Sequence, residues 1–216
     1  MRKTSATRDT VSLAALREEL SACRHCEKVG LIPAARPVFQ LPADPVIGIF
    51  SQAPGNLAHQ KGKPFYDPSG VRLRSWLGID ETIFYSDAVA IAPMAYCFPG
   101  YDGKGPTGRG GDLPPPKVCA ERWRARVMAH ILPSLKVVLL VGAYAQAWHL
   151  GTEKGRTLTE TVAAWPDRFA DAQQTGQLLL PMPHPSWRNT GWLKKNPWFE
   201  AEVIPRLQAA VQDALS

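Results

Sequence analysis

Residues 136–150 read KVVLLVGAYAQAWHL, and this stretch decides the fold class. KVVLLVG, at 136–142, is a continuous apolar run of strand length, as found where a strand is buried on both faces of a sheet. AYAQAWHL, at 143–150, starts a helix immediately after it. A buried strand followed directly by a helix indicates an α/β protein with a parallel sheet.

The same alternation continues on both sides of this unit. Apolar runs predict three further strands, at 46–51, 82–92 and 177–186. Helical periodicity is found at 11–22, 71–79, 118–132 and 197–215, and Pro205 should kink or divide the last of these helices. We therefore expect one domain over residues 1–216, with a three-layer α/β/α fold around a central, mainly parallel four-stranded sheet.

Ligands of such sheets bind beyond the carboxyl ends of the strands. The loops in which we expect site residues are therefore those after the four strands, at 51–66, 87–101, 142–144 and 182–192. Residues 98–118 carry six glycines between 100 and 111 and three consecutive prolines, and this composition predicts a long, basic flap without a core element.

The composition is that of a folded globular protein, since 45% of the residues are hydrophobic and 20% are charged. No run of 18 apolar residues occurs, and residues 1–11 are polar, which predicts a flexible start, no membrane partner and a cytoplasmic location. The formal net charge of +6 favours a polyanionic partner.

Four cysteines, Cys23, Cys26, Cys97 and Cys119, are candidate metal ligands. In a reducing compartment such a set more often binds metal or does redox chemistry than forms disulfides. The C-x-x-C pair at 23–26 suits one metal centre, while the wide spacing of the other two differs from a zinc ribbon. From spacing alone, unrelated buried thiols remain an equal alternative.

Two motifs at opposite ends of the chain give a specific resemblance. The segment Gln52-Ala53-Pro54-Gly55, followed six residues later by GKPFY at 62–66, resembles the first motif of the family 4 uracil-DNA glycosylases, usually GEAPG followed by GRPF. His184-Pro185-Ser186 resembles the HPS motif of the whole superfamily. The order of the four cysteines is also similar to that of family 4, and this resemblance implies that they hold a structural 4Fe-4S cluster.

The resemblance implies roles for several residues of these motifs. Phe65 would stack on a flipped base, with Ala53 and Gly55 beside it, and His184 would hydrogen-bond the leaving uracil. Without the motifs, Phe65 would be read as a core aromatic and His184 as a structural histidine.

The sequence departs from family 4 at the water-positioning residue. Gln52 stands where the family has Glu, and an amide cannot take a proton. Either Gln52 orients the water through hydrogen bonds alone, or another group is the base. His59 occupies a position that is Asp in the family and is the candidate, with a solvated loop side chain as the alternative.

A second departure concerns base reading. The family has an Asn at the end of the second strand, four residues before its third Cys, and we align Asp87 with it, although Asp87 precedes Cys97 by ten residues. An ionised Asp would accept a hydrogen bond from N3–H of uracil but repel O4, so uracil specificity is open. Asp87 as the cap of a turn is the alternative.

The chain after His184 is rich in Trp and basic residues. By resemblance, Trp187 and Arg188 lie in the loop that intercalates into DNA. The residues expected to contact DNA are Lys63, Ser186, Trp187, Arg188 and Asn189. Trp192 and Trp198 are expected to pack against the last helix instead.

These features predict a monomeric, monofunctional DNA glycosylase of a bacterial, nucleoid-associated type. It would hydrolyse the N-glycosidic bond of deoxyuridine in single- or double-stranded DNA and leave an abasic site. Two alternatives remain open: a catalytically weak protein that binds abasic or damaged DNA, and an electron-transfer or zinc protein unrelated to repair.

Overall fold

The computed structural model describes residues 12–103 and 110–216. The expected flexibility of residues 1–11 lies outside the described residues, and so does the middle of the expected flap, at 104–109. No helix within the described ranges combines the length and the apolarity that a membrane span requires.

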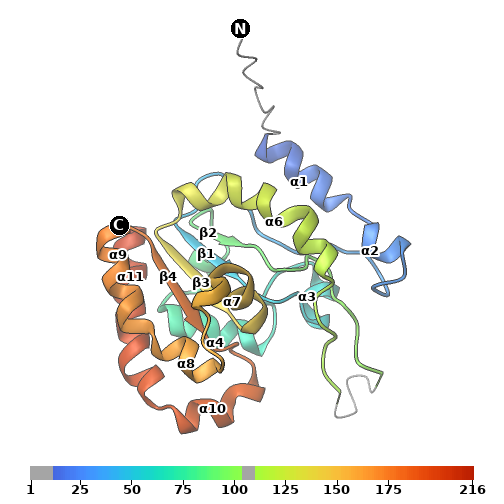
Figure 1. Cartoon of the computed structure of the whole chain (residues 1–216). Helices are drawn as coiled ribbons and strands as arrows, with labels where there is room; N and C mark the ends of the chain where they lie inside the picture. The colour runs from blue at the N-terminus through green and yellow to red at the C-terminus, as the bar shows by residue number, and fades with distance from the viewer. Residues whose placement is uncertain (1–11, 104–109) are drawn as a thin grey trace, which may run out of the picture.

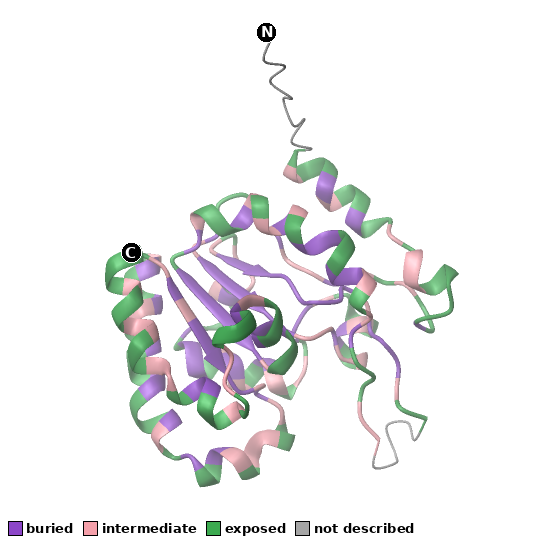
Figure 2. Cartoon of the chain, viewed as in Figure 1, coloured by how far each residue is buried: buried purple, intermediate pink, exposed green. Residues whose placement is uncertain are grey.

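A four-stranded sheet forms the centre of the described chain (Figure 1). Its strands are β1 (Ile47–Phe50), β2 (Val89–Ile91), β3 (Val137–Val141) and β4 (Leu178–Met182), in the spatial order β2-β1-β3-β4. All three strand pairs are parallel, so the carboxyl ends of the strands meet at one edge. The expected sheet is therefore confirmed. Figure 2 shows the strands as the most buried part of the molecule.

Helices cover both faces of the sheet, as the three-layer prediction requires. One face packs against α4 (Pro68–Leu77), α8 (Leu158–Ala163), α9 (Trp165–Thr175), α10 (Thr190–Lys195) and α11 (Ile204–Leu215). The other face packs against α1 (Leu13–Ser21), α6 (Lys117–Ile131) and α7 (Ala143–Leu150). Shorter helices are α2 (His25–Lys28), α3 (Asn56–Lys61) and α5 (Glu81–Phe84). Both faces are apolar because neighbouring strand residues point to opposite sides, as Ile49 and Phe50 do.

Two predicted elements have different bounds in the structure. The helix expected at 71–79 begins at Pro68, because the Asp67 carboxylate accepts a hydrogen bond from the Gly70 amide and caps it. The strand expected at 82–92 is shorter, because Asp80 caps the helical turn α5 and only 89–91 pair in the sheet. Helices α2, α3, α8, α9 and α10 were not predicted.

The closing segment is divided near Pro205, as expected. A π-helix at Phe199–Val203 is followed by α11, and Pro205 lies in its first turn. Trp192 and Trp198 pack around Phe199, with ring centroids 5.8 and 6.4 Å from it, so these two side chains belong to the core, as expected.

A buried arginine joins the ends of two strands. Arg124, on α6, is 1% exposed, and its Nη1 donates to the Ala92 carbonyl just after β2. Its guanidinium lies 4.2 Å from the Phe50 ring centroid at the end of β1, and its Nε donates to Nε2 of His149. Burial and the Arg124 charge lower the pKa of His149 to about 3, so this histidine is neutral and accepts the hydrogen bond.

Candidate active site

A cavity of about 460 Å³ opens at the carboxyl edge of the sheet, where the prediction placed the site. Its walls are the loop after β1, the turn before α4, the end of β2, part of the long connection to α6, and the loop after β4. The lining side chains used below are Gln52, Ala53, Gly55, Phe65, Asp67, Pro93, Asp112, His184, Ser186, Trp187, Arg188 and Asn189.

The first wall is tied to the segment that follows β2. The carbonyls of Ser51 and Gln52 accept hydrogen bonds from the amides of Met94 and Ala95, at 2.8 and 3.0 Å. Gln52, Ala53 and Gly55 therefore reach the cavity on a backbone that continues the pairing of β1 with β2.

Phe65 has a special backbone conformation. Its φ of 53° is the one positive value of a non-glycine residue in the described chain, and such a conformation costs free energy unless the surroundings hold it. The surroundings are close: a Cβ on Gly70 would lie 1.8 Å from the Phe65 carbonyl oxygen. A glycine at 70 therefore lets the first turn of α4 approach this peptide and fix the Phe65 ring, which is 9% exposed, in the cavity wall.

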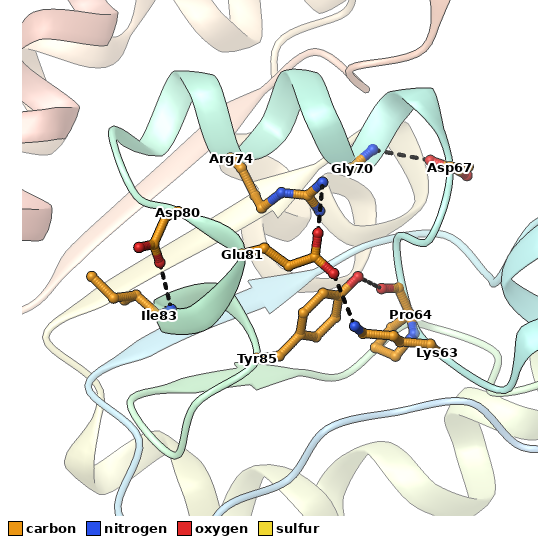
Figure 3. A network of polar contacts seen from close by, with 9 residues as sticks. All are labelled: Lys63, Pro64, Asp67, Gly70, Arg74, Asp80, Glu81, Ile83 and Tyr85. Carbon is orange, nitrogen blue, oxygen red and sulfur yellow. Dashed lines mark hydrogen bonds and ion pairs between the residues drawn. The ribbon is translucent and has the colours of Figure 1, made fainter.

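Polar contacts brace the same turn from outside (Figure 3). The Tyr85 hydroxyl donates to the Pro64 carbonyl at 2.9 Å, next to Phe65, and burial raises the pKa of Tyr85 to about 12. The ammonium of Lys63 lies 3.7 Å from the Tyr85 ring centroid and forms an ion pair with Glu81 at 3.0 Å. The charge of Lys63 is thus paired with Glu81 beside the cavity and does not line it, and its contact with DNA stays a prediction.

His184 enters the cavity from the loop after β4. Its Nδ1 accepts a hydrogen bond from the Ser186 amide at 3.3 Å, and Nδ2 of Asn189 donates to its carbonyl at 2.7 Å. Burial lowers the pKa of His184, while the negative charge of Asp67 opposes this shift. The imidazole is therefore neutral at pH 7. Because Nδ1 accepts a hydrogen bond, the single ring proton is on Nε2, and Nε2–H is the donor of this side chain.

Phe65 and His184 face the same cavity. Their ring centroids are 6.3 Å apart, and the ring planes differ by 28°. The two side chains on which the sequence-based hypothesis depends are thus brought together from positions 119 residues apart. An aromatic face and a neutral N–H donor next to each other suit a flat, hydrogen-bonding ligand that becomes anionic.

The loop at 184–189, called the HPS loop here, is fixed by α4 on one side and exposed to solvent on the other. Nη1 of Arg72, on α4, donates to the carbonyls of Pro185 and Ser186, and the Ser186 hydroxyl caps the short helix Trp187–Asn189. Trp187 is 76% exposed, the highest value among the exposed large hydrophobic side chains. A large apolar side chain displayed at the mouth of a cavity marks an interaction surface.

Two candidates from the sequence do not reach the cavity. Asp87 is exposed in the turn before β2, at the opposite edge of the sheet, because the strand begins later than predicted. Its assignment to the base edge is therefore corrected. His59, on α3, packs against Phe98 with ring centroids 6.0 Å apart and does not line the cavity, so it is not placed to act as the base.

The structure brings in three residues that the sequence did not single out. Pro93, four residues before Cys97, lines the cavity at the end of β2. Asp67 follows Phe65 closely in the chain, and Asp112 comes from the Gly-rich connection. Proximity to Phe65 could have indicated Asp67, whereas no local pattern indicates Asp112.

The four cysteines line one small cavity between α2, the Cys97 segment and the start of α6. Burial raises the pKa of Cys97 to about 11 and that of Cys119 to about 12, and the other cysteines add to both shifts. No three His, Cys, Asp or Glu side chains within the described ranges are spaced to hold a single metal ion. Four thiols around one cavity are the ligand type that an iron–sulfur cluster uses, and the 4Fe-4S cluster itself stays a prediction.

Comparison with known proteins agrees with this site. The model of the uracil DNA glycosylase superfamily matches residues 38–208. The chain belongs to the uracil DNA glycosylase superfamily. The matched range includes every wall of the Phe65–His184 cavity, while Cys23 and Cys26 precede it.

A solved structure is also similar. It is the solution NMR structure of a protein from Methanosarcina acetivorans provisionally assigned as a uracil DNA glycosylase, with 11% sequence identity and a TM-score of 0.42. The match covers 81% of this chain and 98% of that one. The superfamily assignment rests on the sequence match alone.

Proposed function

We propose that the protein is a monomeric, monofunctional DNA glycosylase that removes uracil from DNA. It hydrolyses the bond between the base and the deoxyribose and leaves an abasic site. The observation that carries this proposal is that Phe65 and His184 line one cavity with nearly parallel rings, in a chain of the uracil DNA glycosylase superfamily.

The geometry suggests how the reaction would proceed. A base inside a duplex is out of reach of the cavity, so the nucleotide must swing out and stack on Phe65. As the C1′–N bond breaks, its electron pair stays on the base, and Nε2–H of His184 donates a hydrogen bond to the developing anion. A neutral donor strengthens its hydrogen bond as the charge grows, which lowers the barrier.

The residue at the end of β2 bears on the range of bases. Pro93 has neither a side-chain amide nor a backbone N–H, so it cannot read the uracil edge as the family's Asn does. Selection there depends on shape and on other polar groups. We therefore expect other deaminated bases to be accepted alongside uracil.

We expect DNA to bind at the mouth of the cavity. The exposed Trp187 would fill the space of the displaced base, and the net charge of +6 favours binding to the phosphate backbone. Ser186 and Asn189 would act through the shape of the loop, because their polar groups hold the backbone and His184.

Cys23, Cys26, Cys97 and Cys119 are the residues that would hold a 4Fe-4S cluster. When bound, the cluster would tie the amino-terminal helices to the connection between β2 and α6, a structural role. A visible absorption band of iron–sulfur type with four irons per chain supports it, and a colourless protein with stoichiometric zinc contradicts it.

The activity is tested with uracil-containing single- and double-stranded oligonucleotides, whose abasic products are cleaved with alkali. Strand cleavage that depends on uracil supports the proposal. The absence of cleavage with uracil and other deaminated bases contradicts it. Tight binding to an abasic duplex with negligible turnover would instead identify a damage-binding protein.

A further inference from the structure

The proposed hydrolysis lacks a proton acceptor among the residues discussed so far. The attacking water must lose a proton, and neither the Gln52 amide nor His59, which lies outside the cavity, is placed to take it. Two carboxylates do line the cavity, Asp67 and Asp112. They come from segments 45 residues apart in the chain and meet at the same wall.

Gly55 shows where these carboxylates lie. A Cβ on Gly55 would be 3.7 Å from Oδ2 of Asp112 and 3.8 Å from Oδ2 of Asp67. Both oxygens thus stand over the turn that carries Gln52, and the missing side chain of Gly55 leaves the space in front of them open. Gln52 lines the same cavity as these two carboxylates.

The two carboxylates differ in their partners. Oδ1 of Asp67 accepts a hydrogen bond from the Gly70 amide at 2.9 Å, and this bond caps the amino end of α4. The Asp112 carboxylate accepts no hydrogen bond from residues 12–103 or 110–216. Oδ1 of Asp67 is therefore used to cap α4, while both carboxylate oxygens of Asp112 are open to a water molecule.

The backbone of Asp112 is nevertheless fixed on both sides. The Leu113 amide donates to the Gly100 carbonyl at 2.9 Å, and the Gly111 carbonyl accepts from the Asp102 amide at 3.1 Å. Nη2 of Arg188 donates to the Gly110 carbonyl at 3.0 Å, which attaches this strand-like segment to the HPS loop. A side chain on such a support is positioned before the substrate arrives.

We propose that Asp112 accepts the proton of the attacking water in the reaction of the proposed function, on which this inference rests. The water oxygen forms a bond to C1′ as the C1′–N bond breaks, and one water proton passes to the Asp112 carboxylate. The base leaves as an anion stabilised by His184 and is then protonated by solvent. Gln52 orients the water.

The charges around Asp112 suit a proton acceptor. Burial raises its pKa, Asp67 raises it further, and the positive charge of Arg188 lowers it. Among the described residues, the charged or titratable groups that line the cavity are Asp67, Asp112, His184 and Arg188. A raised pKa makes a carboxylate a better base.

The test is the single-turnover rate of uracil release from a single-stranded oligonucleotide. Asp112→Asn keeps the shape and should lower the rate about 10²-fold, within the range of general base catalysis. The wild-type rate should fall as the pH falls through the pKa of Asp112, and the variant should lose this acidic limb. Asp112→Glu should recover part of the rate.

Controls separate this role from binding and folding. Asp171→Asn, on the exposed surface of α9, should leave the rate unchanged. Binding of Asp112→Asn to an abasic oligonucleotide and its melting temperature should match the wild type. Asp67→Asn tests the competing proton acceptor, and Gln52→Ala tests the orientation of the water.

Each outcome decides the inference. If the wild type is active and Asp112→Asn keeps both its rate and its acidic limb, Asp112 is not the acceptor and the proposed function stands. If Asp67→Asn alone removes the limb, Asp67 takes that role instead. An inactive wild type would overturn the proposed function itself.

Discussion

Two parts of the cavity wall are built in different ways. The loops at 51–69 and 184–189 are short, and α4 fixes both, through Gly70 on one side and Arg72 on the other. The connection from β2 to α6 is long and forms no helix or strand within its described residues. It nevertheless supplies Pro93, Cys97 and Asp112.

This difference separates two tasks. The two short loops hold the stacking ring and the anion donor, whose relative position must be set to fractions of an ångström. The long connection carries Pro93, at the end of β2, and Asp112, the proton acceptor that we propose. Such a division would let the selectivity for the base and the proton acceptor vary in one segment while the stacking ring and the anion donor stay in place.

The largest expected effect is on His184, which lies opposite Phe65 in the cavity. His184→Ala should lower the single-turnover rate of uracil excision by about 10²- to 10³-fold, because it removes the donor to the departing anion. Affinity for an abasic oligonucleotide should stay within a few-fold. His130→Ala, at the end of α6, is the matched control and should keep the full rate. An unchanged rate in His184→Ala would contradict the role of His184 as the donor to the departing base.

The next effect concerns the support of Phe65. Gly70→Ala places a Cβ 1.8 Å from the Phe65 carbonyl oxygen, a backbone atom that cannot rotate away. We expect a loss of about 1–3 kcal/mol in the free energy of unfolding, measured by urea denaturation, and a lower excision rate. Gly191→Ala, which meets no atom within 4 Å, should be nearly neutral. Equal stability of the two variants would contradict the close packing of this turn.

A smaller effect is expected at the exposed rim. Trp187→Ala should weaken binding to a uracil-containing duplex about ten-fold, because the stacking of an aromatic ring on a base contributes about 1–3 kcal/mol. Excision from single strands, where no base needs to be replaced, should change less. Comparing dissociation constants for the two substrates tests this, and an equal loss on both would exclude a wedge role.

The smallest effect is expected in the long connection. Gly111→Ala would bring a Cβ to 2.4 Å from Nη1 of Arg188, but this atom is the end of a flexible side chain and can move. We expect the free energy of unfolding to change by no more than about 0.5 kcal/mol in thermal denaturation. A loss of unfolding free energy as large as that of Gly70→Ala would show that the long connection is as rigid as the loops that hold Phe65 and His184.

The sequence predicts the parts of the fold and of the site that leave a local pattern, and it misses those that depend on contacts between distant segments. The strand at 136–142 was predicted because a fully buried strand leaves a long apolar run, and Phe65 and His184 were found because local motifs surround them. Asp87 was misplaced because the turn that Asp80 caps has the same apolar composition as a strand. Asp112 depends on a backbone pairing with Tyr101, which no local pattern encodes.

The buried guanidinium of Arg124 supports the cavity from the layer beneath its lining. Ala92 and Phe50, two of its contacts, each directly precede a cavity residue, Pro93 and Ser51. One interior cation therefore joins the bases of two cavity walls without lining the cavity itself. Substitutions confined to the lining would leave this support intact.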